Sequence, residues 1–121
     1  MALFDWLQFS VLAKELSARP DEAALRSAIS RAYYAAYNTA KTFCSEKAFP
    51  ISDTGNRHRD LWDAFLKKGG RTFTSVYEKG ERLRRKRTKA DYESDVPGLA
   101  SMVTDSLRES DAILNFLRPK S

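Results

Sequence analysis

The 121-residue chain has a net charge of +5 and contains one cysteine and one histidine. Its length suits one compact core, so we expect a single domain over residues 1–121. One Cys and one His exclude an internal disulfide and a structural zinc site, and no apolar run reaches the roughly 18 residues of a membrane span. We therefore expect a cytoplasmic protein with no membrane segment, metal or cofactor, since Asp5 also interrupts the apolar N-terminus.

Helix boundary signals recur along the chain without a convincing strand pattern, which predicts an all-α fold. A first helix is expected from about Leu3 to Ser17, before Pro20. A long second helix opens at Pro20-Asp21 and carries one apolar stripe. The stripe consists of Leu25, Ile29, Ala32, Ala36, Ala40 and Phe43. Its small alanines should let a neighbouring helix approach closely, which makes this the central helix.

The second half of the chain predicts three more helices. A short third helix follows the polar loop 52–56, runs through Leu61 and Phe65, and ends at Gly69-Gly70. A fourth is expected from about Thr72 to Ala90. A last helix starts near Leu99 and continues to Pro119, with Ser110 and Asp111 interrupting its apolar stripe.

Positive charge is concentrated between Asn56 and Lys89, where twelve basic and four acidic residues give a local charge of +8. This distribution is typical of a surface that binds nucleic acid or polyphosphate. It is equally typical of a solvated helix face rich in lysine and arginine.

The fourth predicted helix distributes its charges over two faces. At 100° per residue the apolar arc contains Phe73, Val76, Gly80, Leu83 and Ala90. The outward candidates for phosphate binding are Arg82, Arg85, Lys86 and Lys89.

Three charged residues, Arg84, Arg87 and Asp91, lie inside or at the edge of the apolar arc instead. An inward charge is costly unless it is paired or lines a wet cleft, so these residues form either a structural ion-pair cluster or a functional site. Arg87 and Asp91 have the spacing of a helical ion pair. Arg84 has no evident acid at a good spacing and is expected to face an anionic ligand.

A second stripe on the central helix combines charged, polar and aromatic residues, namely Ser27, Arg31, Tyr34, Asn38 and Lys41. Arg31 is a candidate for binding phosphate and Tyr34 for stacking on bases, although a dimer interface has the same composition. A third interpretation is that Arg31 pairs with Asp91 across helices.

Four segments together resemble the HEPN superfamily, and most closely its small stand-alone prokaryotic members. They are residues 25–37 (LRSAISRAYYAAY), His58 with 61–65 (LWDAF), 80–83 (GERL) and 87–92 (RTKADY). The resemblance covers nearly the whole chain in the same order. It implies an up-and-down bundle of four main helices with a short additional helix, and a homodimer. It also implies a role among RNA-cleaving toxins, toxin–antitoxin modules or phage-defence effectors.

The RNase signature of that superfamily is an arginine followed roughly four to six residues later by histidine. Arg87 matches the arginine, but Asp91, Tyr92 and Glu93 stand where the histidine is expected. His58 is the remaining group whose ordinary pKa suits acid–base chemistry, unless it caps its helix or bonds a tyrosine. The catalytic candidates are therefore Arg84, Arg87, Asp91, Tyr92 and His58.

Three hypotheses follow. The favoured one is a noncatalytic module that binds RNA or a nucleotide within a toxin–antitoxin or defence system. The second is a metal-independent RNase in which His58, Asp91 or Tyr92 replaces the missing histidine. The third is a protein–protein module whose partner is a nucleotidyltransferase.

Overall fold

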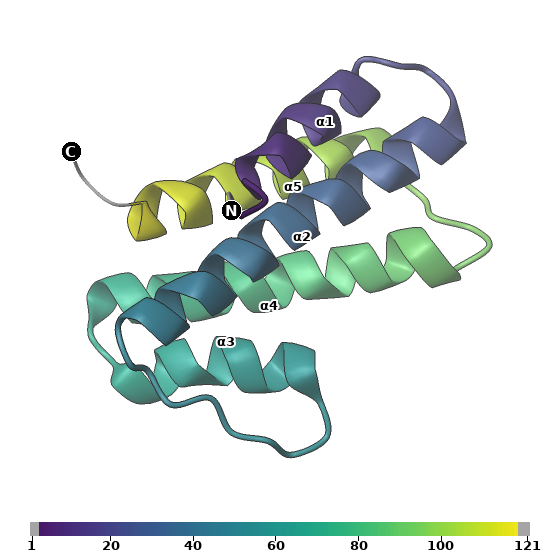
Figure 1. Ribbon diagram of the computed structural model, residues 1–121. Coiled ribbons are helices and arrows are strands. Elements are labelled where there is room, and N and C mark those ends of the chain that lie inside the picture. Colours follow the sequence, from purple (N-terminus) through teal and green to yellow (C-terminus); the bar gives the residue numbers. More distant parts are fainter. Residues whose placement is uncertain (1–2, 119–121) are drawn as a thin grey trace.

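The computed structural model describes residues 3–118, which form five helices and contain no strand. Helices α1 (Leu7–Ser17), α2 (Glu22–Glu46), α4 (Arg71–Tyr92) and α5 (Leu99–Leu117) make the bundle, with successive members running in opposite directions (Figure 1). The additional helix, α3 (Arg57–Lys68), packs mainly against α4. The prediction of an all-α bundle with one extra helix is confirmed.

Side-chain caps fix the starts of α2 and α3. The Asp21 carboxylate accepts a hydrogen bond from the Ala24 amide (3.2 Å), and Asn56 Oδ1 accepts one from the Arg59 amide (3.1 Å). The expected start of the first helix at Leu3 is wrong. Asp5 Oδ1 accepts from the Leu7 amide (3.0 Å), and this bond sets the beginning of α1 at Leu7.

Helix α2 lies at the centre and contacts each of the other four helices (Figure 1). Its buried face contains five fully or almost fully buried alanines: Ala28, Ala32, Ala35, Ala36 and Ala40. Small side chains allow neighbouring backbones to approach, as the sequence predicted. An even closer approach joins α3 to α4, because a Cβ added at Gly80 would lie 2.3 Å from the Trp62 ring.

Helix α5 presents polar residues to the core. Ser110, which was expected to interrupt the apolar stripe, is buried and donates a hydrogen bond to the Ala32 carbonyl (2.7 Å). Glu109 is also buried, whereas Asp111 pairs with Lys14 of α1 at 3.2 Å. These three residues therefore tie α5 to its neighbours. Within residues 3–118, no helix is long and apolar enough to cross a membrane.

Candidate nucleic-acid interface

His58 lies at the start of α3, where Asn56 caps the helix, and its ring contacts tyrosines of α2. The Tyr33 hydroxyl is 2.7 Å from His58 Nδ1 and accepts a hydrogen bond from Trp62 Nε1 (3.2 Å). Because indole only donates, the hydroxyl proton is free for Nδ1, and no other acceptor reaches it within the described residues. His58 therefore accepts at Nδ1 and carries its ring proton on Nε2. The interpretation that His58 bonds a tyrosine is confirmed.

The protonation of His58 is biased toward the neutral ring. Burial lowers its pKa, and the nearby positive charges of Arg87, Arg84 and Arg57 lower it further. At neutral pH the ring thus offers one N–H donor, while its only lone pair is occupied by the Tyr33 hydroxyl. This arrangement suits a hydrogen bond to an anion better than removal of a proton.

Two further tyrosines complete an aromatic surface beside the histidine. The ring centroid of Tyr37 is 4.8 Å from that of His58, and the Tyr34 centroid lies 6.2 Å away. Both tyrosines are half-buried, so part of each side chain is accessible to solvent. The guanidinium of Arg31 stacks on the ring of Tyr34 (5.6 Å) and on that of Phe9 in α1 (4.7 Å).

Arg87 is the buried charge of the site, with a side chain only 9% exposed. Its guanidinium lies 5.3 Å from the Tyr33 ring centroid and 5.7 Å from that of Tyr34. The predicted ion pair with Asp91 is present, but the closest atoms are 3.7 Å apart. Nε is buried and has no hydrogen-bond partner. We refer to Tyr33, Tyr34, Tyr37, His58 and Arg87 together as the His58 cluster.

Arg84, which was expected to face an anionic ligand, pairs with an acidic residue of its own helix. It donates from Nε (3.1 Å) and from Nη2 (2.7 Å) to the two carboxylate oxygens of Glu81. These hydrogen bonds raise the pKa of Arg84. The i,i+3 spacing brings both side chains to the same side of α4, where Glu81 is mostly buried. The expectation that Arg84 has no acid of its own is therefore wrong.

The outward basic residues of α4 divide into paired and unpaired groups. Arg82 Nε binds Glu109 Oε2 of α5 (2.8 Å), and Lys86 binds the other oxygen of the same carboxylate. Glu109 thus pairs with two of the four residues in the predicted phosphate-binding set. Arg85 and Lys89 are exposed and have no ion pair within residues 3–118.

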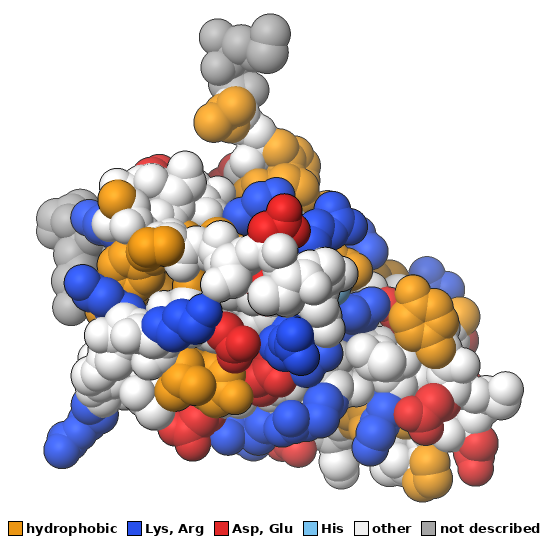
Figure 2. Space-filling model, turned by 90° about the horizontal axis from the view of Figure 1, so that it is seen from below, with side chains coloured by type: hydrophobic (Ala, Val, Ile, Leu, Met, Phe, Trp, Pro, Cys, Tyr) orange, Lys and Arg blue, Asp and Glu red, His pale blue; other side chains and the backbone are white. Residues whose placement is uncertain are grey.

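Charge on the side of α3 is mixed. Figure 2 faces this side and shows Lys and Arg side chains interspersed with Asp and Glu. The basic segment therefore does not form an uninterrupted patch in this view.

Two of the catalytic candidates, Tyr92 and Asp91, make few contacts with the His58 cluster. Tyr92 is 75% exposed and makes no aromatic contact or side-chain hydrogen bond within the described residues. Asp91 accepts from Ser30 (3.4 Å) and contacts Arg87. No ion pair joins it to Arg31, so the interpretation of an Arg31–Asp91 pair is wrong.

Arg26, Tyr33 and Tyr37 make contacts that the sequence did not predict. Arg26 caps the end of α4 by donating to the carbonyls of Ala90 (3.0 Å), Glu93 (2.6 Å) and Ser94 (3.1 Å). Its position two turns before Tyr33 gave no signal of that contact. The i,i+4 spacing of Tyr33 and Tyr37 was readable, but their common neighbour His58 comes from another helix.

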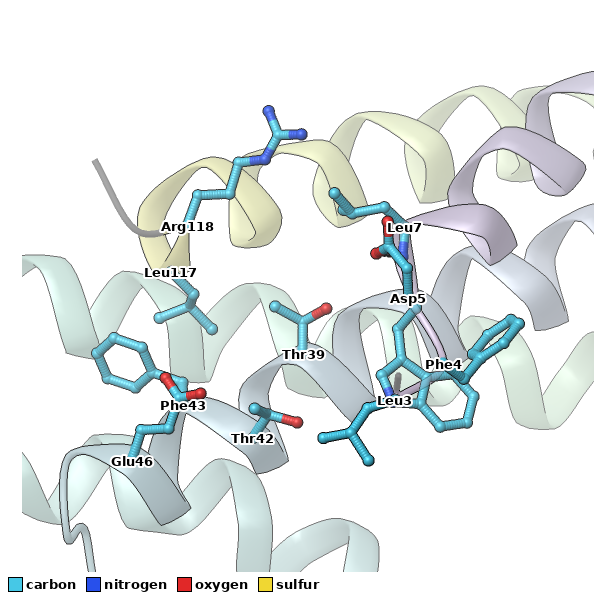
Figure 3. Close-up of a pocket in the computed structure, with 11 residues that line it drawn as sticks. Leu3, Phe4, Asp5, Leu7, Thr39, Thr42, Phe43, Glu46, Leu117 and Arg118 are labelled. Atoms are coloured by element: carbon cyan, nitrogen blue, oxygen red, sulfur yellow. Dashed lines mark hydrogen bonds between the residues drawn. The ribbon is translucent and has the colours of Figure 1, made fainter. Parts of the chain in front are cut away.

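A cavity of about 340 Å³ lies elsewhere, between the N-terminal segment, α2 and the end of α5. Figure 3 shows Thr39 and Thr42 between Leu3 on one side and Leu117 on the other. None of the predicted site residues lines it. Within residues 3–118, no group of three His, Cys, Asp or Glu side chains could hold a metal ion.

No protein-family model matches the chain, and searches of curated proteins and of solved structures find no significant match. The functional interpretation therefore depends on the geometry of the His58 cluster and on the sequence patterns.

Proposed function

We propose that this chain is a HEPN-like module that binds single-stranded RNA or a nucleotide at the His58 cluster and does not cleave it. Within this proposal the protein is a component of a toxin–antitoxin or phage-defence system. The bundle topology and the motif order along the chain support the HEPN-like assignment. The chemistry of the cluster supports the ligand class.

The observation that carries the proposal is the incomplete pairing of Arg87. A guanidinium has five N–H donors, yet Arg87 has one contact to a carboxylate, at 3.7 Å, and a buried Nε without a partner. A buried charge with so little compensation costs free energy in the isolated protein. A phosphate beside the cluster would compensate that charge. We therefore assign Arg87 the central role in anion binding.

Unpaired cations surround the same position. Arg31, Arg57 and Lys41 make no ion pair within the described residues, in contrast to Arg82, Arg84 and Lys86. Tyr34 and Tyr37 add aromatic edges on which bases could stack. On α2, Arg31 and Lys41 flank Tyr34 and Tyr37, and this combination of cations and rings suits single-stranded nucleic acid.

Binding without cleavage follows from the hydrogen bonds of His58. Cleavage of RNA by its own 2′-hydroxyl needs a base that accepts a proton. The Nδ1 lone pair of His58 accepts from Tyr33, and the exposed Tyr92 makes no aromatic contact or side-chain hydrogen bond with the ring. We therefore expect the RNA to remain intact.

Fluorescence anisotropy with a labelled single-stranded octauridine tests the proposal. If Arg31, Arg57 and Arg87 each contact a phosphate, affinity should fall roughly 20-fold between 50 and 200 mM salt, because each contact contributes a slope of about 0.7. Arg31→Ala should reduce this slope by about 0.7. Arg108→Ala, an exposed arginine of α5, is the control and should leave it unchanged. Absence of binding at low salt, or loss of intact RNA on a gel, would overturn the proposal.

The proposal includes a homodimer, as the resemblance implies. Exposed apolar side chains on the N-terminal segment and α1, among them Leu3, Phe4 and Val11, are compatible with self-association. Sedimentation at micromolar concentration should give twice the chain mass. A monomer mass under those conditions would remove the dimer from the proposal.

A further inference from the structure

A small second cavity borders the His58 cluster. It has a volume of about 130 Å³ and lies between α2, the loop that follows it and the start of α3. Its apolar walls are Tyr37, Ile51 and Leu61. Tyr37 belongs to both the cavity and the cluster, because it lines the cavity and its ring centroid lies 4.8 Å from that of His58 and 6.0 Å from that of Tyr34.

One wall of this cavity is held in place by Asp60. This buried carboxylate accepts hydrogen bonds from the Thr54 amide (2.8 Å) and the Thr54 hydroxyl (2.6 Å). The loop before α3 is thereby tied to the helix, so the cavity has a defined shape. Both Asp60 oxygens are occupied, which leaves recognition of a ligand to other groups.

Three charged side chains at the cavity have no partner of their own. Asp53, Lys41 and Arg57 line it and make no ion pair or side-chain hydrogen bond within the described residues. A ligand that fits them must offer donors to the carboxylate and acceptors to the cations. With Asp60 included, the lining carries two cations and two carboxylates, so the ligand is selected by its donors and acceptors and not by a net charge.

The volume limits the ligand to a small group. About 130 Å³ corresponds to roughly four water molecules at liquid density and is well below the 300 Å³ or more of pockets for whole cofactors. One nucleobase fits this scale, with Tyr37 as the aromatic wall.

Guanine matches the three charges best among the bases. It offers two acceptors, O6 and N7, to lysine or arginine, and its exocyclic amine donates to a carboxylate. Adenine lacks the carbonyl acceptor, and cytosine and uracil lack the paired O6/N7 edge. We propose that this cavity binds one guanine base, presented by an RNA strand or by a free guanine nucleotide. The inference rests on the proposed function, since the strand would continue across the His58 cluster.

Anisotropy with four labelled RNAs, each a heptauridine with G, A, C or U at its centre, tests the inference. The strand with G should bind at least about fivefold more tightly than the other three. Asp53→Asn should reduce that preference below about twofold, because the carboxylate that accepts from the exocyclic amine of guanine is lost. Asp95→Asn makes the same change of charge in an exposed turn and should keep the preference.

The outcomes separate the inference from the proposed function. Equal binding of all four strands, or a preference for G that survives Asp53→Asn, overturns the guanine site but leaves RNA binding intact. Failure of all four strands to bind overturns the proposed function itself. Competition distinguishes the two sources. If GMP displaces the labelled G strand more effectively than the unlabelled G strand does, a free nucleotide is the ligand. The opposite order identifies the strand.

Discussion

The hydroxyl of Tyr33 joins His58 and Trp62 in one hydrogen-bonded chain, with 2.7 Å to His58 Nδ1 and 3.2 Å to Trp62 Nε1. Three helices meet at this point, because the residues belong to α2 and α3 and Trp62 packs on Gly80 of α4. These two hydrogen bonds fix the imidazole tautomer and support the aromatic surface around it. Burial also raises the pKa of Tyr33, which keeps its hydroxyl protonated at neutral pH.

Tyr33→Phe should lower the free energy of unfolding by about 1–3 kcal/mol, because it leaves the buried Trp62 N–H without an acceptor. Urea denaturation measures this change. Tyr77→Phe is the matched control, since Tyr77 is half-buried but makes no side-chain hydrogen bond within residues 3–118. Equal stability of Tyr33→Phe and the wild type would show that the hydrogen bonds of the Tyr33 hydroxyl contribute nothing to stability.

Acidification should destabilise the protein through His58. Its pKa is lowered in the folded state, so the unfolded chain, with a pKa of about 6.5, binds the proton first. Stability should therefore begin to fall as the pH drops through 6.5 and continue to fall until the folded-state pKa is reached. His58→Asn should show a shallower loss between pH 7 and 5 in urea titrations. Parallel pH profiles for the two proteins would contradict a lowered pKa of His58 in the folded state.

Substitutions of the two inward arginines should have opposite effects on stability. Arg84→Ala leaves the mostly buried Glu81 without its partner and should cost about 1–3 kcal/mol. Arg87→Met keeps the volume and removes an incompletely paired charge, so its melting temperature should stay level or rise while RNA binding is lost. This reverses the expectation from the sequence, in which Arg87 was structural and Arg84 functional. A destabilised Arg87→Met protein that still binds RNA would restore the earlier assignment.

Gly80→Ala should be destabilising by about 1–3 kcal/mol, because the added methyl would lie 2.3 Å from the Trp62 ring and the helices must separate. Thermal melts measure the effect. Arg85→Ala, at an exposed position of the same helix, should change stability by less than about 0.5 kcal/mol. If the two variants melt together, α3 and α4 do not approach as closely as described.

The Cys44 thiol should be unreactive in the folded protein. It is buried, and burial raises its pKa to about 11, so almost no thiolate exists at pH 8. A thiol-reactive dye should label it only as fast as the chain unfolds. Rapid labelling in buffer, at the rate measured in urea, would be inconsistent with this packing.

Local patterns predicted the helices and the direction of Arg87, because a 3.6-residue period and capping residues depend only on neighbours in sequence. The Glu81–Arg84 pair has a readable spacing and was overlooked. The pairing of Glu109 with Arg82 and Lys86 could not be derived in the same way, since it depends on the register between α4 and α5. The contact of Tyr33 with His58 likewise depends on how α3 packs.

The most direct measurement of the central claim is photo-crosslinking of a 4-thiouridine-labelled single-stranded RNA, followed by tryptic digestion and mass spectrometry. Cleavage after Arg31 and Lys41 releases one peptide, residues 32–41, which carries Tyr33, Tyr34 and Tyr37. Binding at the His58 cluster predicts that this peptide is the principal crosslinked species and that Arg87→Met abolishes it. Crosslinks confined to other peptides, with residues 32–41 unmodified in the wild type, would contradict the account.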